Sequence, residues 1–269
     1  MTGILAALNG PFGRVTYFEI VEPVGNHAHP HVHLLFKISG DDRMMNVEGQ
    51  PVRLDDDTCI LINPWQEHCD IKPDGDSATR MLALYIEPAW LSRHLGGGWQ
   101  RSFEIVTAPI LPHVRSLVDA VRDMIEGGRS DHVAFEALLL ELIQECTAPV
   151  RLPVEMRRSA DYRIKNAVQL LREAPQLHND FRSIARDVGL SRSRFFEQFR
   201  NSVGVAPNMF VDSLVIEEAI RMLAVSGQPL GQISTNLGFA APSSFTRFFK
   251  ERVGFTPSNL RRHVSDAAL

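Results

Sequence analysis

One helical pattern occurs twice in the last third of this 269-residue chain. Each copy has a short apolar group, a glycine, two phenylalanines four residues apart and a final Gly-x-x-Pro. The first copy contains Ile184, Ala185, Val188, Gly189, Phe195, Phe199, Gly204 and Pro207, and the second contains Ile233, Ser234, Leu237, Gly238, Phe245, Phe249, Gly254 and Pro257. The front halves are offset by 49 residues and the back halves by 50, so the extra residue falls in a turn, where insertions are tolerated.

Each copy predicts two short helices joined by a tight turn. Apolar residues three and four positions apart in the front segment give a short amphipathic helix. Gly189 and Gly238 supply the positive φ that a helix C-terminus favours. Ser191 and the Pro242-Ser243 pair are suited to start the second helix, which buries its phenylalanines on one stripe. Together these elements make a helix-turn-helix unit.

The outer face of the second helix in each unit indicates what the unit binds. Arginine reads guanine edges in the major groove, Ser and Thr read several bases, and Lys or Arg at helix ends hold phosphates. The residues predicted to contact DNA are Arg192, Ser193, Arg194, Phe196, Glu197 and Arg200 in the first unit and Ser243, Ser244, Thr246, Arg247 and Lys250 in the second. A charged, solvated face of an ordinary helical bundle is the alternative, and the duplication, charge and spacing favour DNA.

The segment between the two units predicts one continuous helix over residues 207 to about 226, ended by Gly227 and Pro229. About 19 residues at ~1.5 Å each span about 28 Å. This length is close to the ~34 Å between successive major-groove faces on one side of B-DNA. We therefore expect a single chain to read two adjacent turns of the duplex.

Residues 161–262 resemble the DNA-binding domain of AraC/XylS-type transcription regulators. The residues that carry the resemblance are Gly238-Phe239, the run from Ser243 to Lys250, and Gly254-Phe255-Thr256-Pro257. The resemblance implies a double-stranded DNA partner, RNA polymerase as a further partner, and no catalytic residues.

Charge is divided unevenly along the chain. Residues 1–150 carry 11 Lys and Arg against 21 Asp and Glu, whereas residues 151–269 carry 17 against 11. The basic second part suits phosphate binding, and DNA would repel the acidic first part. Three cysteines predict reduced thiols in the cytoplasm, and the sequence has neither an export signal nor an apolar run of 18 residues that could span a membrane.

Short strands are predicted over residues 15–21, 32–38, 44–47, 58–62 and 81–86, with turns between them. Many short strands at this spacing favour a small barrel or jelly roll with room for one ligand. The segment resembles the cupin-like sensory domain that often precedes this DNA-binding module. The expected fold class is therefore α+β, with an N-terminal β-barrel and an all-α C-terminal domain.

A histidine cluster marks the predicted ligand site of the barrel. The residues predicted to bind a small-molecule effector are His27, His29, His31, His33, Trp65 and His68. Converging neutral imidazoles also suit a divalent transition metal, for which His29, His31 and His68 are the candidate ligands. The alternatives are an effector pocket that requires no cofactor, and histidines with only a structural role. Pro30 interrupts the alternation, so the outer histidines could lie on a loop.

Two amphipathic helices are predicted over residues 111–125 and 133–146. In the resembling family such helices commonly pair two subunits, so we expect a homodimer, unless both apolar stripes are buried within one chain. The expected domains are residues 1–147 for sensing and dimerisation, 148–158 for a proline-containing linker, and 159–269 for DNA binding.

The sequence thus predicts a cytoplasmic, effector-responsive transcription regulator. A metal-dependent cupin enzyme or a metal sensor, fused to a DNA-binding module, is the main alternative. An adaptor whose barrel binds a partner protein is a third interpretation.

Overall fold

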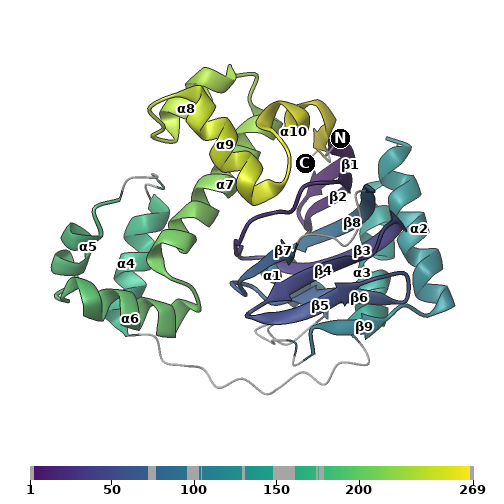
Figure 1. Ribbon diagram of the computed structural model, residues 1–269, viewed down its shortest axis with the longest axis horizontal. Helices are drawn as coiled ribbons and strands as arrows, with labels where there is room; N and C mark the ends of the chain where they lie inside the picture. The colour runs from purple at the N-terminus through teal and green to yellow at the C-terminus, as the bar shows by residue number, and fades with distance from the viewer. Residues whose placement is uncertain are drawn as a thin grey trace.

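The computed structural model describes residues 3–71, 77–95, 103, 105–128, 131–147, 161–173, 175 and 179–266. The first part of this chain forms β-sheets with three helices, and the second part is helical, as Figure 1 shows. The predicted α+β organisation is therefore confirmed. The linker expected at residues 148–158 lies outside the described residues.

The strands form two sheets. A seven-stranded sheet has the order β10-β1-β2-β8-β3-β6-β9, and a three-stranded sheet has the order β5-β4-β7. Their bounds are β1 (Gly3–Gly10), β2 (Gly13–Ile20), β3 (Val32–Gly40), β4 (Arg43–Val47), β5 (Gln50–Leu54), β6 (Thr58–Ile62), β7 (His68–Ile71), β8 (Thr79–Ile86), β9 (Thr107–Pro109) and β10 (Val264–Asp266). Neighbouring strands are antiparallel except for β10, which runs parallel to β1.

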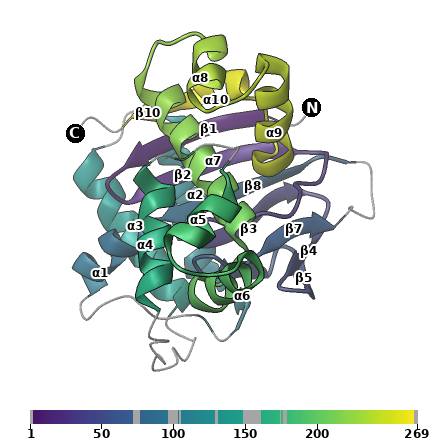
Figure 2. The same ribbon diagram turned by 90° about the vertical axis from the view of Figure 1, so that its left-hand side faces the viewer.

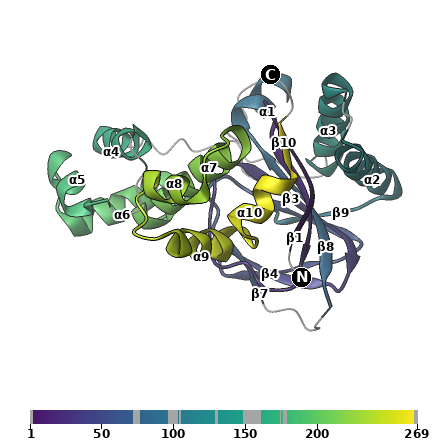
Figure 3. The same cartoon turned by 90° about the horizontal axis from the view of Figure 1, so that it is seen from above.

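Strands β3 and β8 lie at the centre of the large sheet and are buried on both faces. Leu35 and Ala83 belong to the apolar core on one face, and Leu34 and Leu84 belong to the core on the other. This double burial explains why both strands are nearly continuous apolar runs. The second core is completed by α1 (Pro88–Leu95), α2 (Pro112–Glu126) and α3 (His132–Thr147). These helices lie on the side of the sheet away from the helical part of the chain (Figure 3).

The helical part contains both predicted helix-turn-helix units. Its helices are α4 (Tyr162–Glu173), α5 (Phe181–Asp187), α6 (Arg192–Val203), α7 (Pro207–Val225), α8 (Leu230–Asn236), α9 (Pro242–Val253) and α10 (Pro257–His263). Helices α5 and α6 form the first unit, and α8 and α9 form the second. Helix α7 has 19 residues and runs between the units, as predicted (Figure 1).

The turns of the two units have the predicted backbone geometry. Gly189 and Gly238 have φ angles of 72° and 84°, and the glycines that end α6 and α9, Gly204 and Gly254, have φ angles of 101° and 89°. The Ser191 hydroxyl accepts a hydrogen bond from the Arg194 amide at 3.3 Å. Helix α9 has no such side-chain cap and starts with proline instead.

Several elements differ from the sequence prediction. Residues 27–31 form a loop with one isolated bridge, from His27 to His68, and only His33 of the first four histidines lies in β3. Proline has no amide hydrogen to donate to a ladder, so the strand begins only after Pro30. Strands β1, β5, β7, β9 and β10 and helices α1 and α10 were not predicted.

The two parts of the chain share one apolar core. Buried residues of the sheet, such as Phe18 and Ile20, belong to the same cluster as Phe210 of α7 and Phe255. The last helix also contacts the first strand, because the Ile4 amide donates to the Asn259 side chain at 2.7 Å. Strand β10 then continues beside β1, which Figure 2 shows. We call this continuous contact between the sheets and the helical part the docking interface.

Candidate nucleic-acid interface and ligand site

The N-terminal halves of α6 and α9 are open to solvent. Arg192, Ser193 and Arg194 of α6 are exposed, as are Ser243 and Arg247 of α9. None of these side chains is sunk in the interior, so the predicted base-reading positions are accessible.

Intrahelical contacts restrict some of the predicted DNA-contacting residues. Arg194 forms an ion pair of 3.0 Å with Glu197, and Arg192 lies 4.8 Å from the centre of the Phe196 ring. The Phe196 ring itself packs against Phe181 and is partly buried, so part of its role is structural. The Thr246 hydroxyl donates to the Pro242 carbonyl at 3.0 Å.

The C-terminal ends of the same two helices face the sheets. Arg200 of α6 pairs with Glu67 at 3.7 Å, and Lys250 of α9 pairs with Glu22 at 2.6 Å. Arg200 and Lys250 are equivalent, because they are 50 residues apart in the duplicated pattern. The Lys250 ammonium hydrogen-bonds to the Glu22 carboxylate and lowers its pKa. In each unit, the side chain that was predicted to bind a DNA phosphate is therefore paired with a carboxylate of the sheet part.

The turn after each recognition helix also contacts the sheets at an equivalent glycine. A Cβ at Gly204 would lie 3.7 Å from the Trp65 side chain, and one at Gly254 would lie 3.0 Å from Val24. The Gly25 amide donates to the Glu251 carbonyl at 2.9 Å, which joins the loop before β3 to the last turn of α9. The Trp65 and Phe210 rings contact each other across the interface, with centroids 4.8 Å apart and planes tilted by 31°.

A cavity of about 250 Å³ lies within the docking interface. The sheet part contributes Arg14, Asn26, His27, Ala28, His29 and Tyr85, and the helical part contributes Ala206, Asn208, Met209, Asp212, Ser213, Ile216, Glu217, Arg252 and Val253. Most of its residues had no sequence signal, because a cavity between two domains depends on how they dock.

Two arginines line this cavity, and each has a partner. Arg252 donates to Asp212 through its Nε at 3.0 Å. Burial raises the pKa of Asp212, and the nearby Arg252 opposes that rise. The Arg14 guanidinium lies 4.2 Å from the centre of the Tyr85 ring, and burial raises the pKa of Tyr85. The cavity thus combines an apolar floor with a cation from β2.

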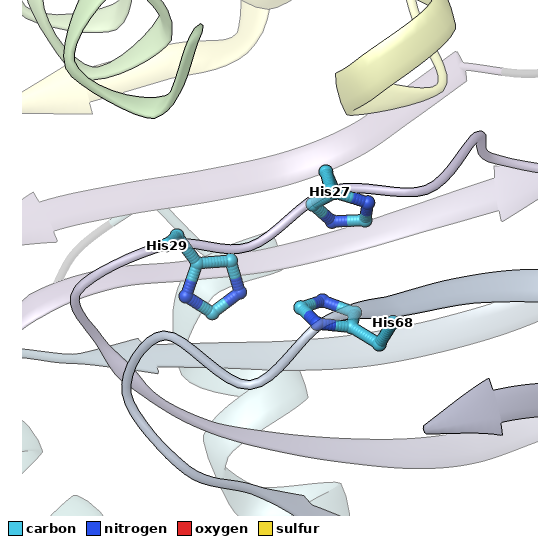
Figure 4. Close-up of side chains that lie close together, drawn as sticks. All are labelled: His27, His29 and His68. Atoms are coloured by element: carbon cyan, nitrogen blue, oxygen red, sulfur yellow. The ribbon is translucent and has the colours of Figure 1, made fainter. Parts of the chain in front are cut away.

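The predicted histidine cluster does assemble beside this cavity. His27, His29 and His68 lie together in Figure 4, with ring centroids 4.2 Å apart for His27 and His68 and 5.0 Å apart for His29 and His68. One ring nitrogen from each of the three lies within 4.8 Å of the others. His33 is next to them, with its ring 4.9 Å from that of His29.

Burial keeps these imidazoles uncharged. It lowers the pKa of His29 and of His68 well below the usual value, and it lowers the pKa of His33 to about 3. His33 makes a 3.0 Å hydrogen bond to the Leu84 carbonyl through Nδ1. A neutral imidazole offers one nitrogen lone pair, which is the form that binds metals.

His31 borders this group, with its ring 5.6 Å from that of His29, but its nitrogens face other partners. His31 makes a 3.1 Å contact with Glu87 and a 3.8 Å contact with Glu217, so the structure joins His27, rather than the predicted His31, to His29 and His68. Trp65 packs on α7 at the docking interface, and Trp90 is buried beneath α3, where it donates to Glu136. Neither tryptophan lines the interdomain cavity.

The geometry defines a class of protein, a two-part molecule in which a cavity-bearing sheet domain is docked on a double helix-turn-helix. Family comparisons agree with this. Residues 22–143 match the AraC-like ligand binding domain, and residues 184–263 match a helix-turn-helix domain, together about three quarters of the chain. The chain belongs to the AraC family of transcription regulators.

Two curated relatives illustrate the similarity. The arabinose operon regulatory protein of Salmonella typhimurium is 27% identical over 154 residues, which are 56% of this chain and 53% of that protein. The chain thus spans about half the length of the first curated relatives it matches. The uncharacterized HTH-type transcriptional regulator YobQ of Bacillus subtilis is 23% identical over 232 residues, or 86% of each chain.

Solved structures share the whole fold. Apo ToxT from Vibrio cholerae has a TM-score of 0.61 and 13% identity, and the alignment covers 96% of this chain and 99% of that one. ToxT bound to an unsaturated fatty acid has a TM-score of 0.59 at 13% identity, and the alignment covers 93% of this chain and 95% of that one.

Among the described helices, none is both long and apolar enough to cross a bilayer.

Proposed function

We propose that this protein is a sequence-specific DNA-binding transcription regulator that responds to a small-molecule effector. The observation that carries the proposal is the duplicated unit, whose two recognition helices expose Arg192, Arg194 and Arg247. In this proposal residues 1–147 sense the effector, residues 148–158 link the domains and residues 159–269 bind DNA.

The docked arrangement suggests how the effector acts. Arg200 and Lys250 cannot hold DNA phosphates while they hold Glu67 and Glu22. The docked molecule is then a weak DNA-binding state in equilibrium with an undocked, stronger one. An effector shifts this equilibrium by the difference between its affinities for the two states.

The interdomain cavity is the best-supported effector site. It is lined by both domains, so a ligand there changes the stability of docking directly. Its apolar floor and Arg14 suit a small organic molecule with an apolar body and one anionic or hydrogen-bonding group. Of the histidines predicted to bind an effector, His27 and His29 line this cavity, and His33 and His68 line a smaller one beside it.

The test is selection of binding sites from random DNA with the full chain, followed by footprinting. We expect a site that spans two adjacent major-groove turns, because α7 separates the two units by about one helical repeat. Selection that enriches no sequence, under conditions where the protein is folded, would reject the proposal.

Association with other proteins forms part of the same proposal. We infer a homodimer, and RNA polymerase as a partner at the promoter. The apolar stripes of α2 and α3 are buried within one chain, so the dimer would pair the outer faces of these helices. Light scattering of the purified protein tests the first inference, because a mass of one chain across the micromolar range would contradict it.

A divalent transition metal is the second candidate effector. It is favoured by the ring nitrogens of His27, His29 and His68, which lie within 4.8 Å of one another beside the cavity. The curated relatives are regulators, so we propose a sensing role and no enzymatic activity.

A further inference from the structure

Three histidines meet where the loop before β3 passes the start of β7. His27 and His68 are joined by two backbone hydrogen bonds, of 3.0 and 2.9 Å, so their side chains are held side by side. His29 follows two residues later and its ring approaches both (Figure 4). We propose that His27, His29 and His68 bind a divalent transition metal ion with an open coordination position toward the interdomain cavity.

Backbone carbonyls fix the tautomer of two of the three rings. Nδ1 of His27 lies 2.8 Å from the Gly25 carbonyl, and Nδ1 of His68 lies 2.8 Å from the Gln66 carbonyl. A carbonyl oxygen only accepts hydrogen bonds, so each Nδ1 carries the proton and each Nε2 keeps its lone pair. Metal-binding histidines are oriented in this way by an outer partner on the second nitrogen.

The remaining nitrogens are buried without partners. Within the part of the chain that the structure describes, neither nitrogen of His29 nor Nε2 of His68 has a hydrogen-bond partner. Buried polar atoms are normally paired, and an unpaired one is costly. An ion that accepts one lone pair from each ring would satisfy Nε2 of His68 and one nitrogen of His29.

The donor set determines the kind of ion. Three neutral imidazoles suit zinc, nickel, cobalt or copper and do not suit calcium or magnesium, which prefer oxygen ligands. Nitrogens around a tetrahedral zinc lie ~2.0–2.1 Å from it, hence roughly 3.4 Å apart. The nitrogens, now within 4.8 Å of one another, would approach by up to about 1.4 Å, and His27 can move because it is partly exposed.

The position of the cluster connects the ion to docking. His27 and His29 line the interdomain cavity, and its opposite wall carries Asp212 and Glu217 of α7. A site with three protein ligands leaves one position for water or a further ligand. The ion would therefore sit on the sheet side of the cavity and be reached from it. This deepens the second candidate of the proposed function, on which its regulatory meaning rests, by naming the residues that would bind the ion and the position left open on it.

The experiment measures metal binding to the untagged full chain after chelator treatment and desalting. Zn²⁺ is titrated against a chromophoric chelator. We expect one Zn²⁺ per chain, and we expect His27→Gln and His68→Gln each to weaken binding roughly ten-fold or more. The matched control is His113→Gln, because His113 is an exposed histidine that pairs with Glu145 on the far helices. Circular dichroism confirms that each variant is folded.

Two results would overturn the inference. One is the absence of stoichiometric Zn²⁺ uptake by folded wild-type protein, which would assign the gap between the rings to water. The other is unchanged binding in both His27→Gln and His68→Gln. Cobalt gives an independent readout, since Co²⁺ bound by this site should show the intense visible bands of four-coordinate cobalt, and these bands should be lost in the variants.

The DNA-binding assay separates this inference from the proposed function. Failure to bind metal with intact sequence-specific DNA binding would remove the metal site alone. Failure to select a DNA sequence with intact metal binding would remove the regulator proposal and leave the site.

Discussion

Single residues of the recognition helices differ in how free they are to meet a base. Arg247 is exposed and lies in α9, whereas Arg194 is paired with Glu197 in the same turn of α6. A side chain held by a neighbour must first leave it, so the second unit is better prepared to read a base. Discrimination by the first unit would then depend on DNA displacing the Arg194 and Glu197 pair.

Replacing Arg247 with alanine should weaken specific binding by about 1–3 kcal/mol and relax the preference at one base pair. Fluorescence anisotropy with the selected site and its single-base variants measures both effects. Arg221→Ala is the control, since Arg221 is an exposed arginine of α7 paired with Glu218. A sequence preference identical to that of the wild type would show that Arg247 does not read a base.

The buried histidines should make the metal-free protein sensitive to acid. The folded-state pKa of His33 is about 3 because of burial, against ~6.5 in an unfolded chain. Below pH ~6.5 the unfolded chain binds a proton that the folded chain excludes, so stability is full above this pH and falls between 6.5 and about 3. His33 alone should cost roughly 1 kcal/mol of unfolding free energy at pH 5.5.

Urea unfolding at pH 7.5 and 5.5, with chelator present, measures this loss. His27, His29 and His68 surround His33, and their pKa values are also lowered, so the wild-type loss should exceed the figure for one residue. His33→Gln should lose less stability than the wild type between the two pH values. Equal losses would mean that His33 titrates normally in the folded protein.

Whole elements are positioned by their ends at the docking interface. The last turn of α9 is held by the hydrogen bond from Gly25, and a Cβ at Gly25 would lie 2.9 Å from the Glu251 backbone oxygen. A backbone atom cannot turn aside as a side chain can. Gly25 therefore permits the close approach between the loop before β3 and α9.

Gly25→Ala should weaken the contact between the loop before β3 and α9. The undocked state would then be more populated, and DNA binding in the absence of effector should be stronger. The matched control is Gly227→Ala, because an added Cβ there meets no atom within 4 Å. The affinity for the selected DNA site is measured for the wild type and both variants in the absence of effector. Wild-type affinity in Gly25→Ala, with the fold intact, would separate this contact from DNA binding.

The elements set by local pattern were predicted well. Strand β6 has the predicted bounds, and α2 and α3 agree with their predicted ranges to within one residue at each end. Strand β7 is short and polar, and β10 depends on a pairing with β1 some 250 residues away, so neither had a local signal. The histidine group was predicted as a cluster, but the choice of His27 over His31 follows from the Pro30 loop.

At the scale of the whole molecule, two equivalent ion pairs oppose DNA binding. Exposed pairs such as Lys250 with Glu22 are screened by solvent and contribute little to stability, so the apolar contacts carry most of the docking energy. Under the proposed function, the pairs place carboxylates on the cations that would hold phosphates. Their effect should therefore be larger on DNA binding than on stability.

The double variant Glu22→Lys with Glu67→Lys should raise DNA affinity several-fold and leave thermal stability nearly unchanged. A change of net charge alone also strengthens binding to DNA. The control Glu126→Lys with Glu145→Lys makes the same charge change on α2 and α3, away from the recognition helices. Anisotropy at two salt concentrations compares them, and equal gains in both double variants would contradict a local role for the two carboxylates.

The parallel pairing of β10 with β1, with the Asn259 bond to Ile4, ties the last helix to the first strand. If the domains separate, these hydrogen bonds must break, and β1 then has no paired strand on its outer edge. A fluorescent donor on β1 and a quencher on α10 would thus turn opening into a change of brightness. A chain labelled in this way would report whether its two domains are docked, without any DNA.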